Sequence, residues 1–398
     1  MRSAGLSVFL FFALNGLIAG SWAPRMPTLA DQIDASHGVL GLALLGASVG
    51  MISAASVSGR LCTRFGARAT MMTSALIGVV TLPVLASVTS PLQLGLMLVL
   101  LGACFGMFDV AMNVAAVTVI RRTERPLMPV FHAGFSFGAL AGSLGAAVAA
   151  GHHVGLVPHF LLVSVVMLAV SVVLIRYVPR EEPAPDTGAH AGLDRRMLRR
   201  PVLWLLGLIA MFSALVEGAN GDWSALFSVR ERGMSEAAGA VTFSVFCVVM
   251  AVVRLAGEQI ERRFGAVRIL VAGALLAGVG MLAAAILPFA WVTYAGFALA
   301  GGGLAFAFPV ALDLAGAVGR RGDGTGGERE IGFVTTIAYS GFLIGPPMIG
   351  GIAQLTSLEF AIGFSGVLAM LIAPVALGSA AARRREEEQA AQEFSKVS

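Results

Sequence analysis

Asp109 and Asn113 lie four residues apart in a stretch from Gly102 to Arg122 that is otherwise almost entirely apolar. Residues four apart share one face of an α-helix, so the carboxylate and the amide would lie together. A carboxylate in the hydrocarbon core of a membrane costs roughly 2.5–3.5 kcal/mol, and one found there usually faces a protein interior or a wet cavity. Asp109 is therefore a candidate proton carrier. The alternative is a structural hydrogen bond to a neighbouring helix.

A second apolar stretch carries polar residues at helical spacing, namely Ser213, Glu217, Asn220 and Ser224. Trp223 lies beside the outer end of this row. We interpret the mid-span Glu217 as a second proton-coupling candidate, with a helix–helix hydrogen bond as the structural alternative. If its carboxylate lies close to the first one, like-charge repulsion would make the two titrate as a pair.

Other side chains could also move or hold charge. The imidazole of His132 can exchange a proton near neutral pH, which makes it either a proton relay or an interfacial histidine. Arg25 lies near the outer end of the first apolar segment, where it could bind an anionic cargo or pair with Asp31 or Asp34.

Charged residues near the inner ends of two segments suggest gating contacts. Arg254 and Glu258 are four apart and predict an ion pair. Asp313 lies within two helical turns of Arg320, which favours a latch at the inner face over a proton carrier.

The composition is that of a membrane protein. Of 398 residues, 57% are hydrophobic and only 13% are charged, whereas a soluble domain has nearer a quarter of charged residues. The 49 glycines suit close helix packing in lipid. Cys62, Cys104 and Cys247 form no Cys-x-x-Cys pair and have no histidine cluster beside them, which predicts neither a disulfide nor a metal site.

Twelve apolar segments are long enough to span a membrane. They cover about residues 5–29, 38–60, 69–90, 92–120, 131–151, 157–177, 202–227, 237–260, 267–289, 291–318, 332–354 and 358–381. The first could instead be a signal peptide, but its apolar run continues past Trp22 and more spans follow. We expect an all-α membrane protein.

The distribution of basic residues predicts the orientation. With the N-terminus inside, 23 of the 27 Lys and Arg residues fall in inside regions, and the other four are Arg25, Arg230, Arg232 and Arg254. Because cytoplasmic loops carry the excess of positive charge, we expect both termini to be cytoplasmic.

The chain divides into two similar halves. Arg64-Phe65-Gly66 recurs as Arg263-Phe264-Gly265, and Trp22 is echoed by Trp223. A stretch rich in proline, charge and small residues separates the copies and is typical of a linker. We predict an N-terminal six-helix half (1–178), a cytoplasmic linker (179–201), a C-terminal six-helix half (202–382) and a cytoplasmic tail (383–398).

Several functions lack their sequence signals. The chain has no nucleotide-binding Gly-rich loop with Lys, no nucleophile elbow and no metal-ligand cluster. We expect neither an enzyme nor a cofactor, with protons as the coupling ion. The expected partners are a small-molecule substrate and the lipid bilayer, without nucleic acid, and we expect a monomer.

The loop after the second segment resembles the cytoplasmic signature G-x-x-x-D-R-x-G-R-R of the major facilitator superfamily. Gly59, Arg64, Gly66 and Arg68 match the signature and Arg60 lies at one of its variable positions, with Thr63 in place of the acid and Ala67 in place of an arginine. The second copy, around Arg263 and Gly265, is looser. The resemblance implies two pseudo-symmetric halves and a gating role for these residues.

Two details resemble particular branches of that superfamily. Asp109-Val-Ala-Met-Asn113 is similar to the fourth segment of fucose-permease-like sugar/proton symporters, in which the acid takes the proton. Asn15-Gly16, Trp22 to Pro27, Phe131-His132 and Tyr339 to Pro347 are similar to the YbjJ-type inner-membrane branch. The resemblance implies segments one, four, seven and ten around a central cavity. The substrate-binding residues that we predict are Asn15, Trp22, Arg25, Asn113, Phe135, Asn220, Trp223 and Tyr339.

These features predict a proton-coupled symporter of a small polar solute, sugar-like or a related metabolite, that works by alternating access in the inner membrane. The alternative is a proton-coupled antiporter that exports a metabolite or drug. Segment five reads Gly142-Ser143-Leu144-Gly145, without the proline usual in the superfamily's antiporters. A third alternative is a membrane sensor that does not transport, or an enzyme of the membrane, which the lack of a soluble domain and of a catalytic motif disfavours.

Overall fold

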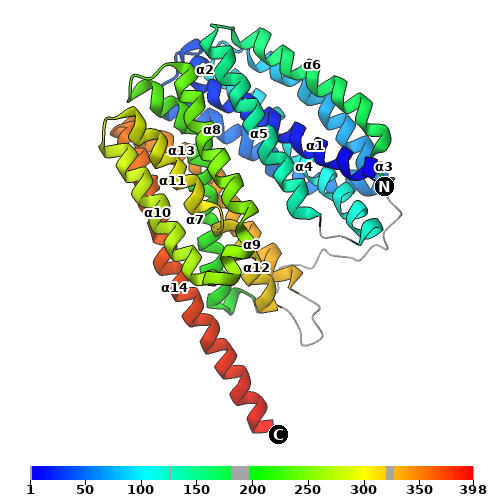
Figure 1. The fold of residues 1–398 in the computed structure, drawn as a ribbon, viewed down its shortest axis with the longest axis vertical. Coiled ribbons are helices and arrows are strands. Elements are labelled where there is room, and N and C mark those ends of the chain that lie inside the picture. Colours follow the sequence, from blue (N-terminus) through cyan, green and yellow to red (C-terminus); the bar gives the residue numbers. More distant parts are fainter. Residues whose placement is uncertain (1, 125–126, 181–196, 320–326, 398) are drawn as a thin grey trace.

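The computed structural model describes residues 2–124, 127–180, 197–319 and 327–397 (Figure 1). In this part of the chain, every regular element is helical, and twelve helical stretches are long and apolar enough to cross a membrane. The predicted all-α fold with twelve spans is therefore confirmed. The predicted linker falls largely on residues 181–196, outside the described residues, as do Arg125, Arg195, Arg196, Arg320 and Arg321.

Two sets of helices follow each other along the chain. The N-terminal half contains α1 (Arg2–Trp22), the 3-10 helix η1 (Ala23–Arg25), α2 (Met26–Gln32), α3 (His37–Leu85), α4 (Pro91–Thr123), α5 (Met128–Gly151), α6 (Leu156–Leu174) and η2 (Ile175–Tyr177). The C-terminal half contains η3 (Met197–Arg199), α7 (Pro201–Arg230), α8 (Glu236–Leu255), α9 (Gly257–Phe264), α10 (Ala266–Ile286), α11 (Ala290–Leu304), α12 (Ala307–Gly319), α13 (Glu328–Leu355) and α14 (Leu358–Val397).

Proline breaks two of the predicted segments. In the first segment, expected at 5–29, the α-helix α1 ends at Trp22. The chain continues as η1, whose first turn contains Pro24, and as α2, whose first turn contains Pro27. The tenth, expected at 291–318, is divided into α11 and α12, with Pro309 in the first turn of α12. A proline lacks the N–H that would continue the helical hydrogen bonds. The predicted end of the eighth segment at residue 260 is wrong, because α8 ends at Leu255.

The repeated Arg-Phe-Gly sequence has the same backbone in both halves. Gly66 (φ 84°, ψ 154°) interrupts the helical backbone of α3, and Gly265 (φ 81°, ψ 149°) separates α9 from α10. This region of φ and ψ is essentially accessible to glycine alone. Arg64 stacks on Phe65 at 5.2 Å and Arg263 on Phe264 at 5.5 Å from the ring centroid. The sequence repeat is thus a structural repeat.

Small residues let α1 and α5 cross closely. A Cβ added to Gly138 would meet the backbone of Ala13, and one added to Gly142 would meet the carbonyl of Leu17. In the other direction, a Cβ on Gly20 would meet the carbonyl of Ala139. The small residues of α5 and α1 therefore form a packing surface between these two helices.

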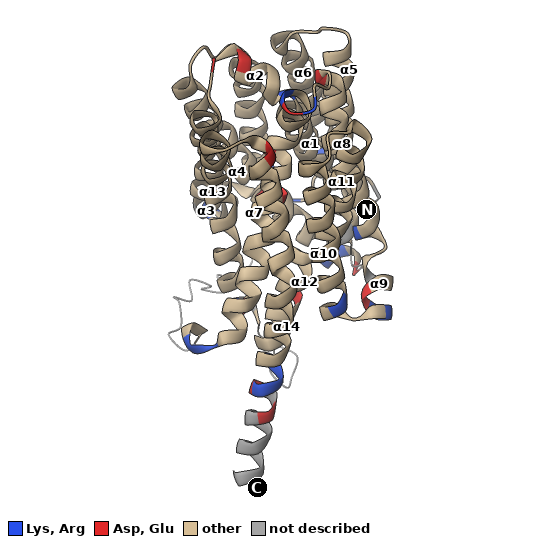
Figure 2. Cartoon of the chain, turned by 90° about the vertical axis from the view of Figure 1, so that its left-hand side faces the viewer, with Lys and Arg blue, Asp and Glu red and all other residues tan. Residues whose placement is uncertain are grey.

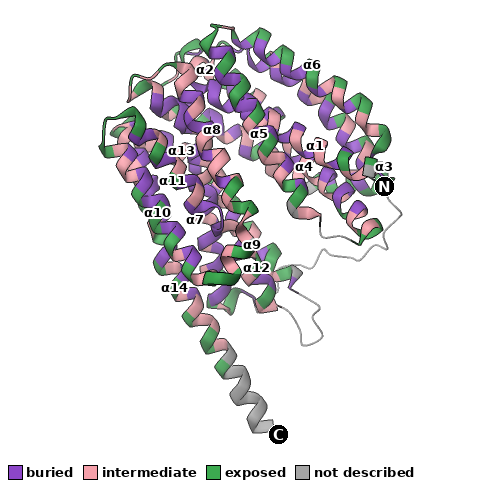
Figure 3. Cartoon of the chain, in the orientation of Figure 1, coloured by how far each residue is buried: buried purple, intermediate pink, exposed green. Residues whose placement is uncertain are grey.

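Burial separates the inner and outer faces of each half (Figure 3). On α6, His159, Phe160, Val163 and Met167 are buried, whereas its opposite face exposes apolar side chains: Leu161, Leu162, Val165, Val166, Val172 and Val173. An exposed apolar face of this kind suits contact with lipid.

The two halves touch at one end, which we call the contact end, and diverge toward the other (Figure 1). Side chains cross between the halves at the contact end. The pairs are Thr28 with Glu236 (2.8 Å), Asp31 with Arg230, the Gly38 amide with Gln354 (3.3 Å), Ser48 with the Phe342 carbonyl (2.8 Å) and Ser143 with Ser244 (2.8 Å). The opposite end, which we call the tail end, carries α9, α12 and the C-terminal part of α14 (Figure 1), and basic residues gather toward it (Figure 2).

Candidate functional site

An ion pair links α7 to α8 in the C-terminal half. Arg254 Nη2 lies 3.4 Å from Glu217 Oε2, and both side chains are partly exposed. Arg254 Nε also donates to the carbonyl oxygen of Ala305 at 3.2 Å. Pro309 has no N–H with which to bond that carbonyl four residues earlier, so the break between α11 and α12 leaves an acceptor that Arg254 takes. Two acceptors, one on α7 and one at the break between α11 and α12, therefore position this guanidinium.

The partner predicted for Arg254 was Glu258, four residues later. Glu258 lies in α9, and its side chain is outside the described residues. The described partner is Glu217, from another helix, so the arginine bridges α7, α8 and the helix break.

His132 of α5 faces this ion pair from the N-terminal half. Its imidazole is exposed, lies edge-on to the Phe12 ring with 5.2 Å between centroids, and lies within electrostatic range of Arg254. A titratable group of one half thus lies opposite the cation of the other half.

Asp109 of α4 is the second charged group at the boundary between the halves. It is half-buried, and among the described residues its carboxylate has no hydrogen-bond or ion-pair partner. Asn113 does not bond that carboxylate; its Nδ2 donates to the backbone carbonyl of Asp109 at 2.9 Å. Tyr339 of α13, in the other half, is 37% exposed and lies within electrostatic range of Asp109.

The structure buries two of the three predicted asparagines, Asn15 and Asn220, inside their own halves. Asn15 is fully buried and faces a cavity of about 10 Å³ among α1, α3, α4 and α6, where neither of its amide atoms has a partner. Asn220 is also fully buried, and its Nδ2 donates to the Val216 carbonyl at 2.6 Å and lies 3.8 Å from the sulfur of Met281 in α10. Each amide therefore packs inside its own half.

Three aromatic residues that were predicted to bind substrate, Phe135, Trp22 and Trp223, differ in burial and in location. Phe135 is half-buried and lies edge-on to Phe105, with 6.3 Å between ring centroids. Trp22 is nearly buried at the end of α1. Trp223 is fully buried at the contact end, edge-on to His37 of the other half at 6.3 Å.

Arg25 is 3% exposed in η1, and its Nη2 donates to the Val154 carbonyl at 3.0 Å. Of the alternatives for Arg25, the pairing with Asp31 is wrong, because Asp31 pairs with Arg230 of α7 across the halves. The carboxylate within electrostatic range of Arg25 is Glu236.

The predicted gating residues of the signature loop lie at the tail end. Gly59, Arg60 and Arg64 are exposed, and Arg68 donates to backbone carbonyls that follow α6. Asp313 is exposed on α12, and its expected partner Arg320 lies outside the described residues.

Sequence reasoning overlooked Asp222. This residue of α7 is half-buried one turn beyond Gly218, which packs against Phe342 of α13. A carboxylate in an apolar span, such as Asp222, is itself a signal of a functional residue. The interpretation of this segment relied instead on the neighbouring Asn220 and Trp223. The Ser143–Ser244 hydrogen bond between the halves was also overlooked, because a serine within an apolar span carries no such signal.

Among the described residues, no three His, Cys, Asp or Glu side chains gather as metal ligands. The chemistry at the boundary is that of charge and hydrogen bonding: a carboxylate without a partner, an ion pair, an imidazole and a phenol. Such groups can bind a polar solute and exchange a proton.

Comparison with known proteins agrees with this architecture. Residues 7–326 match the family described as the Major Facilitator Superfamily. The chain is 31% identical over 373 residues to an uncharacterised MFS-type transporter of Yersinia pestis, covering 93% of this chain and 94% of that protein. It is 28% identical over 367 residues to the membrane protein MosC of Rhizobium meliloti, covering 92% and 87%.

Solved structures with the same fold include the nucleoside transporter NupG, with a TM-score of 0.75, 12% identity and coverage of 95% of this chain and 99% of that one. A bacterial homologue of the human lysosomal transporter Spinster, in an inward-facing and occupied conformation, gives a TM-score of 0.72 at 15% identity, covering 95% and 96%. With twelve spans, a repeated Arg-Phe-Gly turn and a family match over most of its length, this chain belongs to the major facilitator superfamily, a family of transporters rather than enzymes.

Proposed function

We propose that this transporter couples proton movement to the transport of a small polar solute, sugar-like or a related metabolite, by alternating access. The observation that carries the proposal is Asp109, a carboxylate in a membrane-spanning helix without a cationic partner among the described residues. Such a group is accommodated at low cost when a proton neutralises it. Tyr339 of the opposite half lies within its electrostatic range, so its charge state can influence how the halves meet.

Glu217 takes a different part in this proposal. Glu217 already has a cationic partner in Arg254, whereas Asp109 has none among the described residues, so we assign proton uptake to Asp109 and charge-pair switching to Glu217. His132 lies within range of the same cation and is the proposed relay. A solute that bonds to Arg254 would compete with Glu217 and thereby alter this cluster.

Alternating access is supported by where the halves touch. With the contact end outside and the basic tail end in the cytoplasm, as the positive-inside rule predicts, the halves meet at the outer face and separate toward the inner face (Figure 1). We infer an inward-facing state, with both termini cytoplasmic and the protein in the inner membrane. The inward-facing conformation named for the Spinster homologue accords with this.

The proposed solute is small and polar because three predicted binding residues supply an amide, a phenol and an aromatic face and are at least partly exposed: Asn113, Tyr339 and Phe135. Nucleosides, which the name of NupG gives as that protein's cargo, combine a sugar with a flat ring and belong in the screen. The first step is a thermal-unfolding screen of purified protein against sugars, nucleosides, organic acids and antibiotics. Stabilisation that grows with ligand concentration identifies the cargo class.

The cargo found in that screen then tests proton coupling in proteoliposomes. A proton gradient should drive uphill accumulation by the native protein. Asp109→Asn should lose this accumulation but retain cargo-for-cargo counterflow, because exchange needs no net proton movement. Uphill accumulation that survives in Asp109→Asn refutes the assignment. Accumulation against the proton gradient, rather than with it, would support the antiporter instead.

A further inference from the structure

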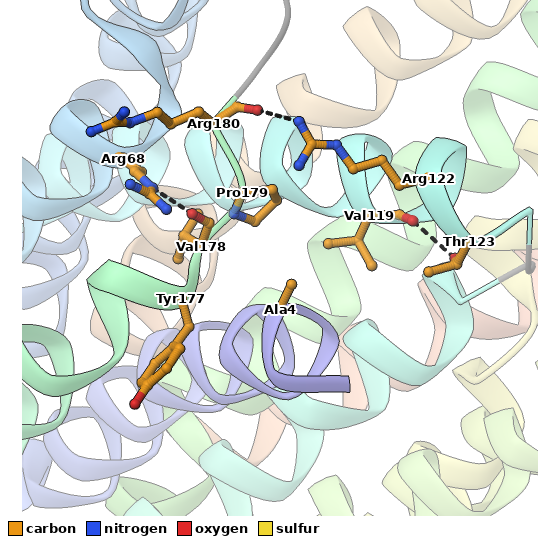
Figure 4. Close-up of a pocket in the computed structure, with 9 residues that line it drawn as sticks. All are labelled: Ala4, Arg68, Val119, Arg122, Thr123, Tyr177, Val178, Pro179 and Arg180. Atoms are coloured by element: carbon orange, nitrogen blue, oxygen red, sulfur yellow. Dashed lines mark hydrogen bonds between the residues drawn. The ribbon is translucent and has the colours of Figure 1, made fainter. Parts of the chain in front are cut away.

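A large and a small cavity lie in the N-terminal half. The large one, of about 510 Å³, is formed by the start of α1, the end of α4 and the segment after η2, and arginine side chains line it (Figure 4). The small one, of about 10 Å³, lies among α1, α3, α4 and α6, and its lining residues are almost all buried. That volume is about what one water molecule requires. Any occupant of the small cavity is therefore very small and enclosed by the protein.

The amide of Asn15 lines the small cavity and is fully buried. Neither its Nδ2 nor its Oδ1 has a hydrogen-bond partner among the described residues. The other two asparagines of the chain, Asn113 and Asn220, donate through Nδ2 to the carbonyl four residues earlier, at 2.9 and 2.6 Å. Asn15 makes no such bond within its own helix. A buried amide without a partner is costly, so this one calls for a ligand in the cavity.

Two more polar residues line the same space. Ser74 Oγ donates to the Cys104 carbonyl at 2.6 Å, and its oxygen retains lone pairs with which to accept. Cys104 also lines the cavity, and a thiol is a weak donor and acceptor. A buried water makes two to four hydrogen bonds, which the groups of these three residues can supply.

The rest of the wall is apolar. It consists of Ile18, Gly78, Leu101, Phe105, Phe108 and Met167. A cavity with this wall alone would stay dry. The amide of Asn15 and the hydroxyl of Ser74 make the difference, because they lie at the same cavity and come from different helices, α1 and α3.

We propose that this cavity holds one ordered water molecule, bound by the amide of Asn15 and the hydroxyl of Ser74. Because water both donates and accepts, it can bond either end of the amide, and the Ser74 oxygen can accept its other hydrogen. The small volume excludes a larger ligand. The water joins α1 to α3, whereas close packing of small residues joins α1 to α5. The site gives Asn15 a ligand other than the transported solute, and it does not depend on which solute that is.

The test is X-ray radiolytic footprinting of the purified full chain, read by mass spectrometry. Hydroxyl radicals form from water where it lies, so a buried methionine next to a bound water is oxidised to its sulfoxide faster than one that is not. Met167 lines the cavity and is 2% exposed. Met71 and Met112 are as deeply buried in the same half but do not line it. Met167 should be oxidised severalfold faster than either of them, and equal rates at all three overturn the proposal.

Matched variants locate the water. Asn15→Leu replaces the amide by an apolar side chain of similar size, so the oxidation rate of Met167 should fall to that of the control methionines. Thr81→Val removes a buried hydroxyl of α3 that bonds the Ile77 carbonyl of its own helix and does not line the cavity, so the rate should stay as in the native protein. Fast oxidation that persists in Asn15→Leu, or that is lost in Thr81→Val, overturns the site. The comparison of methionines in the native protein needs no variant, so it tests the proposal even if Asn15→Leu does not fold.

Discussion

Replacing Gly138 by alanine should destabilise the N-terminal half, against the usual effect of this substitution. Gly138 is buried where α5 crosses α1, and an added Cβ would lie 2.6 Å from the carbonyl carbon and 2.8 Å from the Cα of Ala13. All the atoms that it meets are backbone atoms, which cannot turn aside as a side chain can. Because non-bonded carbon atoms prefer about 3.5–4.0 Å, the two helices must separate by roughly 1 Å.

The cost follows from that separation. Overpacking of a tight contact costs about 1–3 kcal/mol, while the higher helix propensity of alanine returns up to about 1 kcal/mol. Gly145, seven residues later on the same helix, is exposed and would meet no atom within 4 Å. Gly145→Ala should therefore be neutral or stabilising by up to about 1 kcal/mol. The two substitutions have the same chemistry and opposite expected signs.

The assay is unfolding of the purified variants in mixed micelles with increasing SDS, followed by far-UV circular dichroism. Gly138→Ala should have a lower free energy of unfolding than the native protein, and Gly145→Ala should not. Equal stability of Gly138→Ala and the native protein would falsify the close crossing of α1 and α5. A loss in both variants would mean that glycine acts through local backbone conformation and not through this contact.

Three further predictions concern the proposed mechanism. Glu217→Gln and Arg254→Gln should each impair transport, and a double-mutant cycle on stability should give a coupling of about 0.5–1 kcal/mol, because the 3.4 Å pair is partly exposed. Additive effects of the two substitutions on the free energy of unfolding would show that the ion pair contributes nothing to stability. Gly66→Leu should cripple uptake while membrane insertion is retained, because φ 84° and ψ 154° cost a non-glycine residue about 1–3 kcal/mol; normal uptake in proteoliposomes would contradict a gating role for the turn. Cysteines at Asp31 and Arg230, joined by a thiol-reactive bifunctional crosslinker, should stop transport by holding the contact end closed, and transport that continues after complete crosslinking would argue against alternating access at this end.

Local sequence properties were sufficient to predict the architecture. The length and hydropathy of each segment predicted twelve spans, because a helix that crosses lipid must satisfy its own backbone and present apolar side chains. The repeated Arg-Phe-Gly predicted two similar halves, and its two copies form equivalent turns because only glycine readily adopts the backbone of Gly66 and Gly265. Both inferences depend on interactions within a few residues of the chain.

The helix breaks in the first and tenth segments were harder to predict from the sequence. A proline in an apolar span permits a kink, a break or the start of a helix, and the neighbouring helices select among these. At Pro309 the selection involves Arg254, which bonds the carbonyl that the proline leaves without a donor. The arginine lies 51 residues from that carbonyl in the chain, so no local pattern connects them.

The composition of the candidate site was decided by the tertiary structure. The sequence identified Asp109, Glu217 and Arg254 as unusual in apolar helices, because charge in lipid is costly wherever it occurs. It could not tell which neighbour each helix face meets. Asn15 and Asn220 therefore face the interior of their own halves, although they look as suitable for binding as Asn113. Which polar groups share a space depends on the rotation and crossing of helices that are distant in the chain, and packing of the whole bundle fixes these.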